Sequence, residues 1–74
     1  MYVARTDGQP PTEADIAAVV GILNRGVRTI LRYGIELGYP NQIYVISVPS
    51  NIAGVTAKEL NNAGYKFGYD ESFS

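Results

Sequence analysis

The sequence predicts one small α/β domain spanning residues 1–74, with α+β as the alternative, and the element order β-α-β-α-β around a three-stranded sheet. A run at 42–48 is rich in β-branched and aromatic residues and apolar at odd and even positions, which is typical of a central strand covered on both faces. A long stretch with apolar residues three and four positions apart precedes this run. A short alternating stretch near the end of the chain predicts the last strand.

The first element is a short edge strand. Residues 1–5 alternate weakly and contain Tyr2 and Val3, which favour β structure. The segment 6–11 that follows holds an Asp-Gly pair and two prolines, so it predicts a turn and the end of the strand.

A long helix over 12–37 is the second predicted element. Thr12 can cap the helix with its hydroxyl, and Asp15, three residues later, completes a variant of the capping box. Apolar residues then fall within an arc of roughly 120° as far as Leu37. An unbroken helix would be ~37 Å long against ~23 Å for the central strand. Because glycine weakens helices, we expect a kink or break near Gly26, with close packing against another backbone as the alternative.

The two faces of the central strand carry different side chains. Tyr44, Ile46 and Val48 share one face, whereas Ile43 and Val45 share the other. Helical connections favour parallel neighbouring strands, and the order 1-2-3 would place both helices on one face. We therefore expect a second copy, or a partner, to cover the apolar side chains of the other face.

A short helix and a strand complete the chain. Thr56 and Glu59 match the usual capping box, so a helix is predicted over 56–63. Alternating aromatic and polar residues predict the final strand over 65–69. Residues 70–74 are expected to form a frayed tail in which the one phenylalanine could dock.

The composition bounds the class of protein. The chain has no cysteine and no histidine, and its six Lys and Arg nearly balance seven Asp and Glu. A single core of this size rarely supplies more than ~3–5 kcal/mol without a disulfide, a metal or an oligomeric partner. Self-association is therefore the expected source of extra stability, and general attraction to nucleic acid is not expected.

The location predicted from the sequence is cytoplasmic. Residues 1–5 lack the charged start and long apolar core of a signal peptide. The longest apolar-plus-glycine run, 16–23, is far shorter than the ~18–20 residues that cross a bilayer, so no contact with a membrane is predicted.

Three arginines form the first candidate binding site. On the predicted long helix, Arg25, Arg28 and Arg32 lie within a ~60° arc opposite the apolar residues. Their planar guanidinium groups suit phosphate or carboxylate, so this arginine ridge could contact a nucleotide, a nucleic acid or an acidic protein surface. The alternative is a solvated helix face on which Glu36 offsets one of the charges.

A second candidate is the loop after the central strand. Ser50 and Asn51 stand at an edge of the sheet where α/β proteins commonly bind ligands, so a phosphate or small molecule could bind there. The loop matches neither a P-loop nor a dinucleotide motif, and ordinary turn chemistry is the alternative explanation.

Aromatic residues supply the candidate interface. Six tyrosines are many for this length, and tyrosine is enriched at contact surfaces. Core packing is the alternative for some of these side chains, and base stacking is disfavoured because acidic residues follow the last aromatic group. The candidate interface residues are Tyr44, Ile46, Tyr65, Phe67 and Tyr69.

No catalytic, metal or cofactor motif stands out, so the sequence predicts a non-enzymatic protein without a cofactor. The predicted function is protein–protein contact by a homo-oligomeric regulator or inhibitor of a larger complex, for example a phage or mobile-element inhibitor of host defence. One alternative is an oligomeric module that binds a nucleotide or other phosphorylated molecule between the arginine ridge and the Ser50–Asn51 loop. A second is nucleic-acid binding through the ridge.

Overall fold

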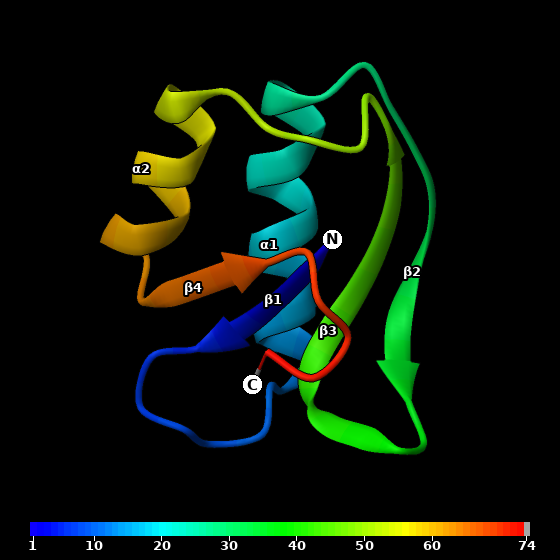
Figure 1. Cartoon of the computed structure of the whole chain (residues 1–74). Coiled ribbons are helices and arrows are strands. Elements are labelled where there is room, and N and C mark those ends of the chain that lie inside the picture. The colour runs from blue at the N-terminus through cyan, green and yellow to red at the C-terminus, as the bar shows by residue number, and fades with distance from the viewer. Residues whose placement is uncertain (74) are drawn as a thin grey trace.

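The computed structural model describes residues 1–73, which form two helices and a four-stranded sheet (Figure 1). Their succession, β-α-β-β-α-β, is that of the ferredoxin-like or split β-α-β arrangement. The elements are β1 (Tyr2–Arg5), α1 (Glu13–Gly26), β2 (Thr29–Glu36), β3 (Tyr39–Val48), α2 (Gly54–Asn62) and β4 (Tyr65–Gly68).

The sheet is antiparallel throughout, with strand order β2-β3-β1-β4. The predicted three-stranded sheet with order β-α-β-α-β and parallel neighbours is therefore wrong, and the α+β alternative holds. The error has one source, the second half of the predicted helix 12–37, which forms β2. The added strand pairs with β3 as a hairpin, so it reverses the direction of β3 relative to β1.

Helix α1 begins as predicted and ends early. The Asp15 backbone N–H donates to Thr12 Oγ1 at 3.2 Å, and the Thr12 N–H donates to the Asp15 carboxylate at 2.8 Å, which makes a capping box. The helix ends at Gly26, where the break was expected. A Cβ at Gly26 would lie 1.9 Å from Thr56 Oγ1, so α1 also passes very close to α2 at this glycine.

Residues 29–36 form a strand because an alternating pattern is present beside the helical one. Leu31, Tyr33 and Ile35 are two positions apart, and β-branched and aromatic side chains favour a pleated surface over a helix. The helical pattern used Ile30 and Leu31 in this segment, and Leu31 belongs to both patterns, so spacing alone did not separate the two structures.

Both helices pack on one face of the sheet. The expected division of the central strand is confirmed, because Ile43 and Val45 are buried in the core while Ile46 on the opposite face is 50% exposed. Within the chain only the helix side of this strand is covered, and cover of the other face by a second copy or a partner stays a prediction. The core joins residues of both helices to β1, β3 and β4: Val3, Val19, Ile22, Leu23, Ile43, Val45, Leu60 and Tyr65.

Helix α2 begins at Gly54, earlier than predicted, and no side chain caps its first turn. Thr56 lies inside the helix and is 1% exposed, facing Gly26. Glu59 forms an ion pair with Arg25 of α1 at 2.7 Å. The predicted capping box is wrong because both of its side chains contact α1 instead.

The tail after β4 folds over part of the open face, the sheet face away from the helices. A Cβ at Gly68 would lie 2.9 Å from the Phe73 ring, and Lys66 Nζ lies 5.7 Å from the centre of that ring. The Gln42 side-chain amide donates to the Glu71 carbonyl oxygen. The predicted frayed tail therefore docks through Phe73, while Ser74 lies outside the described residues.

Candidate functional site

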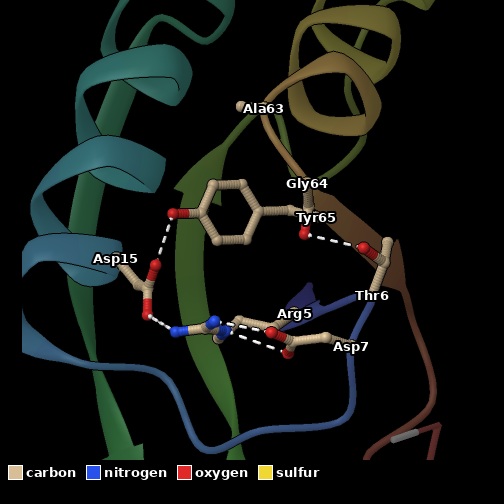
Figure 2. A pocket seen from close by; sticks show the side chains of 7 residues that line it. All are labelled: Arg5, Thr6, Asp7, Asp15, Ala63, Gly64 and Tyr65. Carbon is tan, nitrogen blue, oxygen red and sulfur yellow. Dashed lines mark hydrogen bonds and ion pairs between the residues drawn. The ribbon is translucent and has the colours of Figure 1, made fainter.

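A polar hollow of about 180 Å³ lies where the end of β1 and the start of β4 meet the first turn of α1 (Figure 2). Arg5 donates to Asp7 at 2.6 Å and to Asp15 at 3.1 Å. The Tyr65 hydroxyl donates to the second carboxylate oxygen of Asp15 at 2.7 Å. One carboxylate therefore ties two strands to the capped end of the helix.

The charges in this hollow are fixed near neutral pH. The hydrogen bond from the Thr12 backbone, followed by that from Tyr65, lowers the pKa of Asp15 to about 2. Burial, followed by the hydrogen bond to Asp15, raises the pKa of Tyr65 to about 12. A general acid or base must exchange a proton near pH 7, and neither of these two groups does so. The Arg5–Asp15–Tyr65 cluster is therefore a structural clamp.

A cluster of metal-binding side chains and a membrane-spanning helix are both absent from the described residues. Among residues 1–73, no group of three or more carboxylates is placed to hold a metal ion. No helix in this part of the chain is long and apolar enough to cross a membrane.

A second hollow, of about 270 Å³, opens on the open face between β1, β2 and β3. The Arg32 side chain lies over Tyr44, with its guanidinium carbon 5.7 Å from the ring centre and its Nε donating to the hydroxyl at 3.3 Å. This hydrogen bond raises the pKa of Arg32, which stays charged. The full lining is Met1, Tyr2, Arg32, Glu36, Tyr44, Val45 and Ile46.

Exposed apolar side chains lie on both faces of the two strands that border this hollow. On β3, Ile46 and Val48 are 50% and 36% exposed. Four further apolar side chains lie along β2 and the turn that follows it, and we call them the β2 apolar row. They are 40% to 103% exposed: Leu31, Tyr33, Ile35 and Leu37. Tyr33 and Ile35 lie opposite Val45 and Ile43, so they stand on the helix side of the sheet edge, whereas Ile46 and Val48 stand on the open face.

The structure separates the predicted arginine ridge. Arg25 lies on α1 and pairs with Glu59, Arg28 lies in the connection after that helix, and Arg32 projects from β2. The ridge geometry is wrong because the helix that would align the three residues ends at Gly26.

Two predicted binding residues, Ser50 and Asn51, and one predicted interface residue, Tyr69, do not line the second hollow. Ser50 and Asn51 are exposed in the connection between β3 and α2, and a role for them in ligand binding stays a prediction. Tyr69 is 55% exposed, and its hydroxyl accepts a hydrogen bond from the Ile52 backbone at 3.3 Å.

The predicted interface residues divide between core and surface. Tyr65 is only 6% exposed and belongs to the core, against which Phe67 also packs. Tyr44 and Ile46 lie on the open face beside Arg32, so the structure brings these three candidates together.

The sequence interpretation missed Tyr2, Glu36 and the β2 apolar row. Tyr2 lies directly opposite Tyr44 across β1 and β3, so a correct prediction of the strand register would have identified it.

Comparison of the chain with known protein families, with curated proteins and with solved structures gave no match.

Proposed function

We propose that this chain is a non-enzymatic binding protein that acts through protein–protein contact and associates with copies of itself. The observation that carries the proposal is the set of exposed apolar side chains on β2 and β3, which lie on both faces at this edge of the sheet. The side chain of Leu37 is fully exposed to solvent, and that of Leu31 is 63% exposed. Apolar surface gains about 25 cal/mol for each Å² removed from water, so contact with a protein would stabilise these positions.

The polar groups of the molecule support binding over chemistry. The most strongly held carboxylate, Asp15, is bound by Thr12, Arg5 and Tyr65, which lowers its pKa. The sequence contains no histidine or cysteine to act as a base or nucleophile near neutral pH. A small domain of this kind fits a regulator or inhibitor that binds a larger complex.

A nucleotide-binding function has weaker support. Arg32 shares its cleft with Glu36, whose carboxylate would repel a phosphate, and Arg25 is already paired with Glu59. The separated arginines likewise give nucleic acid no continuous basic surface.

The proposal is tested by the mass of the purified protein in solution, measured by light scattering over a hundredfold range of concentration. We expect a mass that rises above the 8.0 kDa of one chain as the concentration increases. A single 8.0 kDa species throughout would contradict self-association. In parallel, a nucleotide panel should leave the melting temperature unchanged, and a rise of several degrees would instead favour the ligand-binding alternative.

A further inference from the structure

We propose that two copies of the chain pair through β2, antiparallel and around a two-fold axis at Gly34, so that the sheet of one copy continues into the other. The inference rests on the proposed function and names the surface that the second copy uses.

Strand β2 is an edge strand with an uncovered outer side. It is eight residues long, stands at the end of the sheet and, among residues 1–73, pairs with β3 alone. The outer edge of such a strand presents backbone N–H and C=O groups that can pair with another strand. Edge strands are usually blunted by charges, prolines, bulges or short length. Strand β2 has no proline and only two charged residues, Arg32 and Glu36, and its pairing is regular between the two register shifts.

The position of the axis follows from these two charges. With the axis at Gly34, Arg32 of each copy lies opposite Glu36 of the other, and opposed residues point to the same face. Within one copy the two residues are ~13 Å apart along the strand, too far for a direct ion pair. None of the ion pairs found among residues 1–73 involves either of them.

Neighbouring registers lose this charge match. An axis at Tyr33 places Arg32 opposite Gly34, and an axis at Ile35 places Glu36 opposite Gly34. An axis at Arg32 or at Glu36 places like charges opposite each other, which is destabilising. The uninterrupted part of the pairing with β3 runs from Arg32 to Ile35, and the axis falls within it.

The same register pairs the β2 apolar row with itself. Tyr33 of one copy lies opposite Ile35 of the other, an aromatic and β-branched pair of the kind that stabilises sheets. Leu31 comes opposite Leu37, and these are the two most exposed leucines on this part of the surface, at 63% and 103%. Pairing would therefore cover side chains that the single chain leaves in water.

The surroundings of Glu36 also favour a basic partner. Glu36 lies beside Glu71 of the tail, and its carboxylate raises the pKa of Glu71 because it favours the protonated form of that group. Arg32 of the second copy would bring a positive charge to this acidic pair. Because solvent screens such pairs, they contribute mainly to the choice of register rather than to affinity.

The test reverses one charge at a time in the full chain. Arg32→Glu and Glu36→Arg each place two like-charge pairs across the axis, so each should weaken self-association roughly tenfold or more. An equimolar mixture of the two variants restores both opposite-charge pairs and should form a one-to-one complex. Arg28→Glu, in the connection outside the strand, changes the net charge as Arg32→Glu does and should leave self-association unchanged.

Sedimentation equilibrium gives the association constants, and circular dichroism checks that each variant is folded. Complex formation by the mixed variants, which are weak alone, is the expected result. Native self-association that neither reversal weakens and mixing does not restore would overturn the β2 pairing while leaving self-contact in place. If Ile46→Arg alone abolishes association, the second copy lies on the open face and the β2 inference is likewise wrong. A native chain that stays monomeric overturns both.

Discussion

Asp15 shows how one residue holds several elements of this small fold. Its carboxylate accepts hydrogen bonds from the Thr12 backbone, from Arg5 of β1 and from Tyr65 of β4. Helix capping, strand attachment and a buried tyrosine therefore depend on one charge. Its side chain is only 16% exposed, so water screens these contacts weakly.

The pH dependence of stability should reveal this role. The pKa of Asp15 is about 2 in the folded chain and ~3.9 in an unfolded one. Because the folded value is the lower one, the contribution is complete above about pH 4 and is lost as the pH falls towards 2. Asp15→Asn should cost about 1–2 kcal/mol at pH 7 and less at pH 2. Urea unfolding at several pH values measures this difference, and a cost that does not change with pH would contradict the assignment.

The sequence identified Arg32 and Tyr44 as candidate site residues but not as neighbours. Their contact depends on the register of β2 against β3, in which Arg32 lies opposite Ile46, next to Tyr44 on the same face. Register is a long-range property, set by the hairpin and by burial, and spacing within one segment does not contain it.

At the level of elements, prediction succeeded where local chemistry decides the structure. The Thr12–Asp15 cap, the break at Gly26 and the strand at 65–68 all follow from adjacent residues. It failed for β2, where Ile30 and Leu31 continue the helical pattern while Leu31, Tyr33 and Ile35 alternate as in a strand. It also failed for the cap at Thr56, because that hydroxyl is buried against α1. Both failures reflect tertiary contacts that override local preference.

Two glycines of α1 offer a matched test of how the helices pack. A Cβ at Gly26 would lie 1.9 Å from Thr56 Oγ1, whereas a Cβ at Gly21 would meet nothing within 4 Å. Gly26→Ala should therefore destabilise the fold by about 1–3 kcal/mol through overpacking. Gly21→Ala should stabilise it by up to about 1 kcal/mol, because alanine is the better helix former.

Thermal and urea unfolding compare the two variants with the native chain. Adding Thr56→Ala to the Gly26 variant removes the two closest atoms and should recover part of the loss. Equal effects of the two alanine substitutions would mean that α2 does not pack against α1 at Gly26.

On the scale of the whole molecule, the helices cover one face of the sheet except along β2, and the opposite face has no helix on it. The tail covers part of the open face through Phe73, but Ile46 on that face and the β2 apolar row at the edge remain exposed. A core of this size gives the fold a small free energy of unfolding. Association that covers exposed apolar residues would therefore stabilise the fold as well as serve the function.

This coupling predicts a melting temperature that rises with protein concentration. A partner that binds only the folded chain, at a hundred times its dissociation constant, adds about 2.7 kcal/mol to the free energy of unfolding. Since 1 kcal/mol shifts the melting temperature of a domain of this length by about 4–8 °C, the melting temperature should rise by roughly 10–20 °C. The Arg32→Glu variant should melt at a nearly constant temperature over the same range, because like charges then oppose pairing of β2. If the native chain also melts at one temperature at all concentrations, self-association does not stabilise its fold. The exposed residues of β2 would then be a binding surface for a different protein.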